Sequence, residues 1–253
     1  MKVNLEKLLE NIPAGISVIR NPRDYDRAIR THPFYKEMLT QIIDFGRAYS
    51  PKRKRVLEIG AGTGTLTERA VFGVGQFDKY IAIEPDEGAF RFLKEKMGDT
   101  PKLELVNDRI ENLAGEKFDL IISSFVDHHI PYEKKKEYYR KIHSLLHPEK
   151  AYVSGEEFVQ DFKNEKERTD ALKKYHGWVI RKCLEENHLL MAMIEAQALK
   201  NGIEKFDEYK TSLKKYLERM RSAGFEITEK RKIGPDDSVL KNSGIYVVVG
   251  KSR

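Results

Sequence analysis

Three closely spaced glycines mark the part of this sequence with the clearest chemical meaning. Gly60, Gly62 and Gly64 lie within residues 55–70, RVLEIGAGTGTLTERA, between a short apolar run and the start of a predicted helix. A strand, a glycine-rich turn and a helix bring the backbone close to a nucleotide-like ligand in doubly wound α/β folds. Glycine suits such a turn because it tolerates positive φ and carries no Cβ. The turn therefore predicts a binding site for a nucleotide-like cofactor.

An acidic residue follows at the spacing expected for a ribose contact. Residues 79–83 (KYIAI) predict a second strand, and Glu84 comes directly after it, 24 residues beyond Gly60. A carboxylate accepts hydrogen bonds from two vicinal hydroxyls at once. Pro85 then ends the strand because it has no N–H to donate. We therefore predict that Glu84 binds the cofactor ribose.

A further carboxylate follows the third expected strand, residues 103–106. The sequence there reads Asn107-Asp108-Arg109-Ile110. A carboxylate at this place accepts a hydrogen bond from an exocyclic amine, and the next backbone N–H donates to a ring nitrogen. The pair Asp108 and Arg109 is thus predicted to contact an adenine edge. The alternative is that Asp108 caps a helix over residues 109–113, and both roles can coexist.

An aspartate and two histidines follow the fourth expected strand, residues 118–123, where a reaction partner should lie. Histidine can accept a proton near neutral pH, so we predict catalytic roles for Asp127 and His128 and a substrate contact for His129. The alternative for either histidine is a structural role. All three side chains are metal-ligand types, but consecutive residues rarely converge on one ion. We therefore predict no metal site.

A second cluster of reactive side chains occurs near the apolar run LLMAMIEAQAL. Leu184, His188, Met191 and Glu195 are spaced to share one face of a helix. Burying the Glu195 carboxylate in that run is costly unless it is paired. We predict a catalytic role for Glu195 and substrate contacts for His188 and Met191. The alternative is that Glu195 reaches solvent.

Strand and helix patterns alternate around these residues with the lengths of a parallel sheet with right-handed crossovers. The last two expected strands, residues 225–230 and 244–249, have no predicted helix between them and should be antiparallel neighbours. The fold class predicted is α/β: a doubly wound, Rossmann-like, seven-stranded sheet with an antiparallel C-terminal strand pair and a helical cap insertion.

The same patterns predict the domain organisation. Residues 1–47 form an N-terminal helical lid that places Tyr25 over the cofactor, with a break at Pro33. Residues 48–157 and 206–253 form the core, and residues 158–205 form the cap. The cap is expected to be helical, with a break at Gly177 and an end at Asn201-Gly202.

Composition limits the classes of protein that remain. The chain has 253 residues, of which 40% are hydrophobic and 34% are charged, and 46 basic minus 40 acidic residues give a net charge of +6. This excess permits nucleic-acid binding without demanding it. A single cysteine, Cys183, excludes an intramolecular disulfide. No signal peptide or membrane-spanning run is expected, so we predict a cytoplasmic protein without membrane contact.

With these motifs in order, the sequence resembles the class I S-adenosylmethionine-dependent methyltransferases. The resemblance rests on VLEIGAGTGTLT, IAIEPD, VNDRIENL, FDLIISSFVDHHIP and the terminal SAGFEI and GIYVVVG, and covers about residues 50–157 and 206–253. It implies S-adenosyl-L-methionine as cofactor and S-adenosyl-L-homocysteine as product. It also implies cofactor contacts from Glu58, Gly60, Ala61, Gly62, Glu84, Asp108, Arg109, Ser123 and Ser124. To these we add Tyr25 of the predicted lid and Pro85, which follows Glu84.

The nature of the methyl acceptor is less constrained. The segment after the fourth strand is similar to the "LHH" pattern of small-molecule methyltransferases, with Asp127 in place of leucine. We predict direct in-line transfer to an O or N nucleophile of a small molecule held between core and cap. The alternatives are an RNA base methyltransferase and a cofactor-binding protein without turnover. A dinucleotide dehydrogenase is disfavoured because Thr65 replaces the third glycine of GxGxxG. A homodimer is left open.

Overall fold

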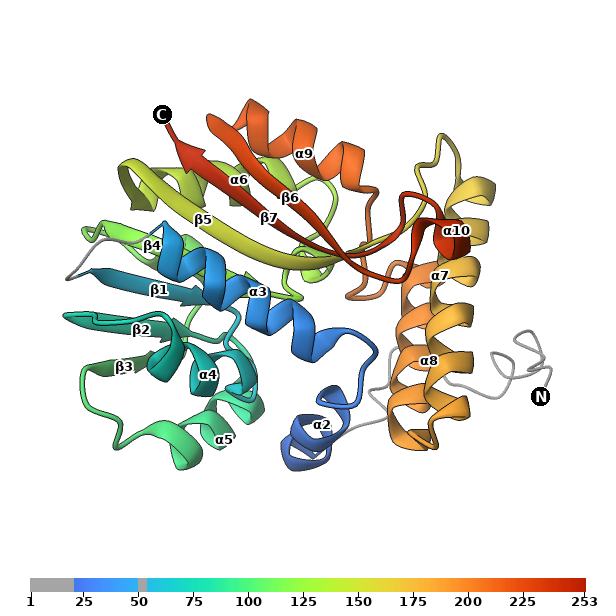
Figure 1. The fold of residues 1–253 in the computed structure, drawn as a ribbon, viewed down its shortest axis with the longest axis horizontal. Coiled ribbons are helices and arrows are strands. Elements are labelled where there is room, and N and C mark those ends of the chain that lie inside the picture. Colours follow the sequence, from blue (N-terminus) through green and yellow to red (C-terminus); the bar gives the residue numbers. More distant parts are fainter. Residues whose placement is uncertain (1–20, 50–53) are drawn as a thin grey trace.

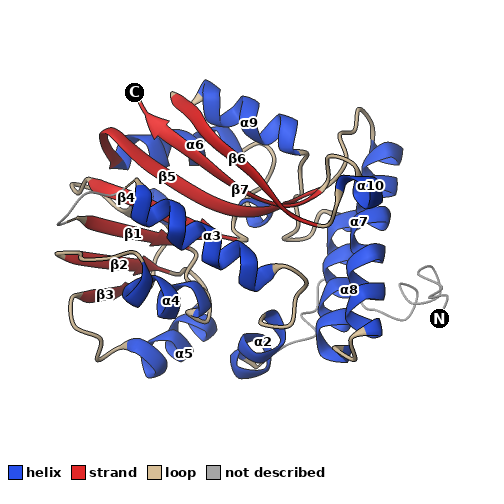
Figure 2. Ribbon diagram, viewed as in Figure 1, coloured by secondary structure: helices blue, strands red, loops and turns tan. Residues whose placement is uncertain are grey.

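The computed structural model describes residues 21–49 and 54–253, so the first 20 residues of the predicted lid lie outside the described part. The strands form one seven-stranded sheet in the order β3-β2-β1-β4-β5-β7-β6 (Figures 1 and 2). Their bounds are β1 Arg55–Ile59, β2 Lys79–Ile83, β3 Leu103–Val106, β4 Phe118–Ser124, β5 Leu146–Phe158, β6 Phe225–Gly234 and β7 Gly244–Ser252. Strands β1 to β5 run parallel, and β7 pairs antiparallel with both β5 and β6. The predicted fold class and the closing antiparallel pair are confirmed.

Helices cover both faces of this sheet because its central strands are apolar on both sides. One hydrophobic cluster joins the sheet to α3 (Tyr35–Ala48), α4 (Thr65–Gly73) and α5 (Glu87–Met97). A second cluster joins the other face to η1 (Ile110–Asn112), α6 (Lys135–Leu145) and α9 (Leu213–Ser222). In β4, Leu120 and Ile122 face the first cluster, and Phe118 and Ile121 face the second. This double burial explains the unbroken apolar run in the sequence.

The segment predicted as the cap folds into a pair of helices. Helices α7 (Glu165–Glu185) and α8 (Leu189–Glu204) lie side by side at one end of the sheet (Figure 1). The expected break at Gly177 is wrong, because Gly177 is buried within α7. The chain turns instead at Asn187, whose φ is 62°. The expected end at Asn201-Gly202 is also wrong, because α8 continues to Glu204 and ends at Lys205 in the left-handed region.

The N-terminal segment links the cap to the sheet. Helix α2 (Pro22–Ile29) begins at Asn21, whose side chain accepts a hydrogen bond from the Arg23 N–H. The predicted break at Pro33 is confirmed, since Phe34 lies in the left-handed region before α3. The Phe34 ring stacks on Trp178 of α7 with 6.1 Å between ring centroids. This contact fixes α2 and α3 against the cap.

The expectation of no helix between the last two strands is wrong. The connection between β6 and β7 contains a single helical turn, α10 (Asp237–Leu240), which begins where the Asp236 side chain accepts a hydrogen bond from the Ser238 N–H. None of the helices in residues 21–49 and 54–253 is long and apolar enough to span a membrane.

Candidate active site

A cavity of about 970 Å³ opens at the carboxyl ends of the central parallel strands. Its walls include the glycine turn after β1, Glu84 after β2, the loop after β4, and side chains of α2 and α8. Strand β1 lies between β2 and β4, so the crossovers leave it toward opposite faces of the sheet. This switch point is where open α/β sheets bind their ligands.

The glycine turn and Glu84 form one hydrogen-bonded unit at the cofactor end of the cavity. The Glu84 carboxylate accepts from the Gly62 N–H at 2.8 Å through one oxygen and from the Asp86 N–H at 2.8 Å through the other. Gly60 has a φ of 66°, and a Cβ built on it would lie 2.5 Å from Val126 Cγ2. A Cβ on Gly62 would meet nothing within 4 Å, so the turn is open toward the cavity. This cradle, with a carboxylate beside it, fits the ribose of a nucleotide-like cofactor.

Glu58 does not line this cavity, although the resemblance placed it against the cofactor. Its buried carboxylate accepts a hydrogen bond from the Tyr80 hydroxyl at 2.6 Å, beneath the glycine turn. Burial raises the pKa of Glu58 to about 7, against the opposing effect of hydrogen bonds from Tyr80 and Thr67. Because side chains alternate along a strand, the acid that precedes the turn is directed into the protein rather than toward the ligand.

This buried acid makes stability depend on pH. The folded state holds the Glu58 proton more tightly than the unfolded chain, whose carboxyl has the ordinary pKa of 4.5. The stabilisation is therefore complete below pH 4.5 and is lost as pH rises through about 7. We expect Glu58→Gln to remove up to about 3 kcal/mol of this pH dependence. Urea unfolding at about pH 5 and about pH 8.5 measures it, with exposed Glu133→Gln as control. Equal pH dependence of stability in the wild type, Glu58→Gln and Glu133→Gln would contradict a raised pKa for Glu58.

Of the remaining residues predicted to contact the cofactor, six line the cavity and one does not. The wall contains Tyr25, Ala61, Pro85, Asp108, Arg109 and Ser124. Asp108 Oδ1 accepts hydrogen bonds from the Arg109 N–H at 2.7 Å and from Asn112 Nδ2 at 2.6 Å. Ser123 is a correction: it is fully buried, does not line the cavity, and its hydroxyl meets the Tyr152 hydroxyl at 2.8 Å. Only the second serine of the pair faces the ligand space.

Asp127 is a further correction. Its side chain points away from the cavity, into the protein, where Oδ2 accepts a hydrogen bond from Lys135 Nζ at 2.7 Å. The Tyr139 hydroxyl donates to the other carboxylate oxygen, and Lys135 Nζ also contacts the Asp127 carbonyl. Lys135 is fully buried. These contacts make Asp127 the anchor of the loop after β4 and not a group that touches a ligand.

The two histidines of the same loop do line the cavity. His128 is buried, with its Nδ1 3.4 Å from Glu156 Oε2, and His129 is half exposed, with its Nδ1 2.9 Å from the Asp207 carbonyl. The two imidazole centroids lie 4.3 Å apart. Burial, reinforced by the positive charge of Lys210, holds the pKa of His128 well below its usual value. Its imidazole is therefore neutral at physiological pH.

Of the residues predicted in the cap, Met191 and Glu195 line the cavity and His188 does not. His188 lies at the turn before α8, with Nε2 3.7 Å from exposed Glu186. The expected common face fails because the helix is interrupted between Leu184 and Met191. Glu195 is only 4% exposed. Its carboxylate can be buried because neighbouring side chains pair with it.

Glu195 belongs to a buried ionic network at the end of the cavity opposite the glycine turn. It accepts from His176 Nδ1 at 2.8 Å and lies 3.5 Å from His32 Nε2. His32 Nε2 is also 3.0 Å from Glu157, which Lys210 Nζ approaches to 3.0 Å. Burial alone would lower the pKa of His32, but the carboxylates of Glu157 and Glu195 raise it to about 10. Burial and Glu157 would raise the pKa of Glu195, but hydrogen bonds from His176 and His32 lower it to about 2.

Sequence reasoning missed His32, Glu157, Glu208 and Lys210, all of which line the cavity. His32 lies in the turn before α3, Glu157 near the end of β5, and the other two in the segment before α9. No short motif connects these segments. The available signal was a charged pair, Glu156-Glu157, directly after the uncharged run AYVSG of the same strand.

The fold and the cavity together define a Rossmann-like α/β protein with a site for a nucleotide-like cofactor. A family model described as a methyltransferase domain matches residues 57–149. An uncharacterized methyltransferase from Oceanobacillus iheyensis is 23% identical over 175 residues, which are 68% of this chain and 75% of that protein. The methyltransferase-domain match and the relatives support a class I S-adenosylmethionine-dependent methyltransferase, with S-adenosyl-L-methionine as its cofactor.

Solved structures share the fold at low identity. The N-methyltransferase NodS from Bradyrhizobium japonicum, in complex with S-adenosylhomocysteine, aligns with a TM-score of 0.58 and 13% identity over 98% of this chain and 96% of that one. The 1,6-didemethyltoxoflavin-N1-methyltransferase from Burkholderia thailandensis aligns with a TM-score of 0.55 and 16% identity over 96% of this chain and 95% of that one.

Proposed function

We propose that this enzyme methylates an O or N nucleophile of a small molecule held between the sheet and the cap, by direct in-line displacement. The observation that carries the proposal is a single cavity that runs from Glu84 and the glycine turn to Glu195 on α8. A pocket that both core and cap line suits an acceptor of metabolite size. The Burkholderia thailandensis neighbour, whose structure contains a small-molecule acceptor and S-adenosylhomocysteine, supports this reading by analogy.

In this proposal the chain acts chiefly by binding and alignment. S-adenosylmethionine supplies a methyl group already activated by its sulfonium. Glu84 binds the ribose, and Asp108 with Arg109 contacts the adenine. His128, His129 and Met191 contact the acceptor, and Tyr25 on α2 helps exclude water. Orienting two reactants in this way accounts for a large part of such a rate enhancement.

An RNA acceptor is the second candidate, and the charge of the cavity disfavours it. At the acceptor end, the wall carries the carboxylates of Glu157, Glu195, Asp207 and Glu208 against two cations, the Lys210 ammonium and the His32 imidazolium. RNA-binding sites instead present basic groups to the phosphate backbone. Net positive charge over the whole chain does not change the sign of this surface.

Methyl transfer from radiolabelled S-adenosylmethionine tests the three candidates together. We expect label in a desalted small-molecule extract of cells and none in total RNA. Label in RNA alone would support the second candidate. Binding of S-adenosylhomocysteine with no label in either pool would support a cofactor-binding protein without turnover.

Glu195 provides a more specific test. We expect Glu195→Gln to raise the KM for the acceptor about tenfold, because one charge-assisted contact is lost. The affinity for S-adenosylhomocysteine should be unchanged, since Glu195 lies at the other end of the cavity. Steady-state kinetics and calorimetry measure the two effects. Exposed Glu185→Gln is the control, and an unchanged KM would exclude Glu195 from acceptor binding.

The homodimer and the cytoplasmic location stay predictions.

A further inference from the structure

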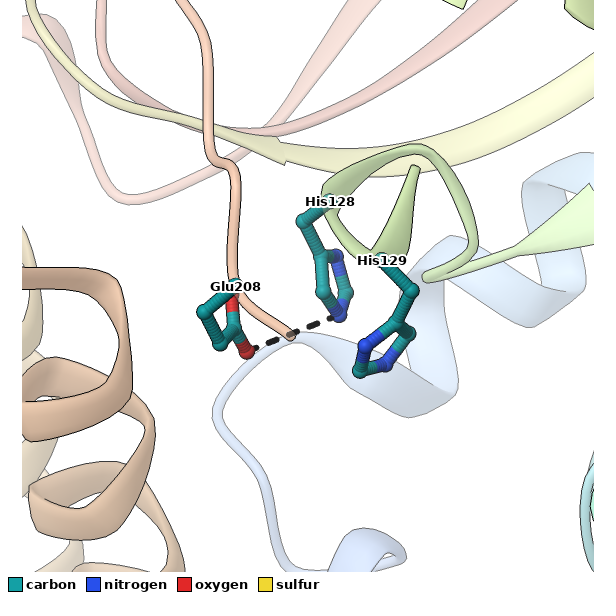
Figure 3. A group of neighbouring side chains, drawn as sticks. All are labelled: His128, His129 and Glu208. Atoms are coloured by element: carbon teal, nitrogen blue, oxygen red, sulfur yellow. Dashed lines mark ion pairs between the residues drawn. The ribbon is translucent and has the colours of Figure 1, made fainter. Parts of the chain in front are cut away.

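Two segments far apart in the sequence bring three metal-ligand side chains to the rim of the cavity. His128 and His129 come from η2 (Asp127–His129), and Glu208 comes from the segment before α9 (Figure 3). One ligand atom from each lies within 4.8 Å of the others. The distance between His128 Nε2 and Glu208 Oε1 is 3.9 Å. All three side chains line the cavity.

Backbone contacts fix the two segments against each other. The Tyr209 N–H donates to the His128 carbonyl at 2.6 Å, and the Tyr132 hydroxyl donates to the Lys210 carbonyl at 2.8 Å. Glu208 is thereby held opposite the histidines by its own neighbour in the chain. Its Oε2 lies 3.3 Å from Lys210 Nζ, while Oε1 is directed toward His128.

A second carboxylate stands behind His128. Glu156 Oε1 accepts the Val126 and Asp127 N–H groups at 2.6 and 2.8 Å, which leaves Oε2 3.4 Å from His128 Nδ1. Both His128 Nδ1 and Glu156 Oε2 are buried without a hydrogen-bond partner of good geometry. A carboxylate behind the distal nitrogen of a histidine is the arrangement that orients metal-binding imidazoles, and a small rotation of the ring completes it.

A second triad among the described residues provides a contrast. His32, Glu157 and Glu195 also lie close enough to hold an ion. Lys210 Nζ approaches Glu157 to 3.0 Å, and His176 Nδ1 approaches Glu195 to 2.8 Å. Both carboxylates of this second triad are therefore already paired, Glu157 with Lys210 and Glu195 with His176. In the first triad only Glu208 Oε2 lies near a lysine, and Oε1 is directed toward the imidazoles.

We propose that His128, His129 and Glu208 bind a divalent transition-metal ion of the zinc type at the acceptor end of the cavity. Two histidines and one glutamate are a known donor set for zinc with an open position. The separation of 3.9 Å must contract to about 3.3 Å for tetrahedral ligation. Half-exposed His129 has room to adjust.

The sequence alone argued against a metal because it offered only consecutive ligands, and the third ligand comes instead from a distant segment. The open position of the ion faces the cavity. It suits an acceptor that offers an oxygen atom as a ligand. This role of the ion in acceptor binding rests on the proposed function, whereas zinc binding itself does not.

Zinc binding by the tag-free full chain, stripped with EDTA and dialysed, tests the site without any acceptor. We expect one Zn²⁺ per chain by calorimetry, and a visible absorption band on titration with Co²⁺. His128→Ala, His129→Ala and isosteric Glu208→Gln should each weaken Zn²⁺ binding at least about tenfold. His188→Ala is the matched control, because that histidine also has a carboxylate neighbour but lies outside the cavity.

Affinity for S-adenosylhomocysteine, measured in every variant, shows that the cofactor site remains folded. The proposal is overturned if the wild-type chain binds no Zn²⁺, or if Glu208→Gln and His129→Ala bind it as tightly as His188→Ala. Should His128→Ala fail to fold, these two variants decide the question. Zinc binding without methylation of any small molecule would overturn the proposed function and leave the site standing. Methylation of a small molecule by a chain that binds no zinc would overturn the zinc site and leave the proposed function standing.

Discussion

Glu84→Ala is expected to weaken binding of S-adenosylhomocysteine by at least about 100-fold. In our assignment the carboxylate binds both ribose hydroxyls, and each hydrogen bond to a charged group contributes about 1.5–3 kcal/mol. The same carboxylate accepts from the Gly62 and Asp86 N–H groups, so its removal also releases the glycine turn. Isothermal titration calorimetry measures the loss without turnover.

The control for this variant is Glu87→Ala, which removes an exposed carboxylate three residues away on α5. Glu87 pairs only with exposed Arg91 in the described structure, so its loss should leave affinity unchanged. Far-ultraviolet circular dichroism establishes that both variants keep the fold. A Glu84→Ala protein with wild-type affinity would remove Glu84 from the cofactor site.

Lys135→Met should destabilise the protein by about 3–5 kcal/mol, because it leaves the Asp127 carboxylate buried without its cation. Lys135 is fully buried and Asp127 is 4% exposed, so water cannot replace the lost partner. Urea denaturation measures the change as a lower midpoint at constant slope. Exposed Lys136→Met on the same helix is the matched control and should change stability little.

A double variant separates the anchoring role of Asp127 from a catalytic one. Adding Asp127→Asn to Lys135→Met removes the unpaired charge, so part of the lost stability should return. If Asp127 were catalytic, the double variant would be inactive at temperatures where it is folded. Equal stability of Lys135→Met and Lys136→Met would contradict the buried pair.

The cofactor half of the site could largely be predicted from the sequence because its signals are local. The glycine turn and Glu84 each directly follow a strand, and parallel strands bring their carboxyl ends to one edge of the sheet. Any sequence with these runs in this order places the two groups together. The local sequence pattern could not decide which side chains face the cavity. Glu58 and Ser123 occupy the expected positions but point toward Tyr80 and Tyr152.

The acceptor half depended on tertiary structure. Asp127 could not be separated from His128 by sequence, since only the position of Lys135 on α6 shows which of them turns inward. Glu208 meets His128 across some 80 residues of chain, a convergence that no periodicity encodes. Charged side chains can be buried only where compensating charges arrive from other elements. The sequence by itself therefore determined the cofactor, and tertiary packing decided which polar residues line the part of the cavity where we propose that the acceptor binds.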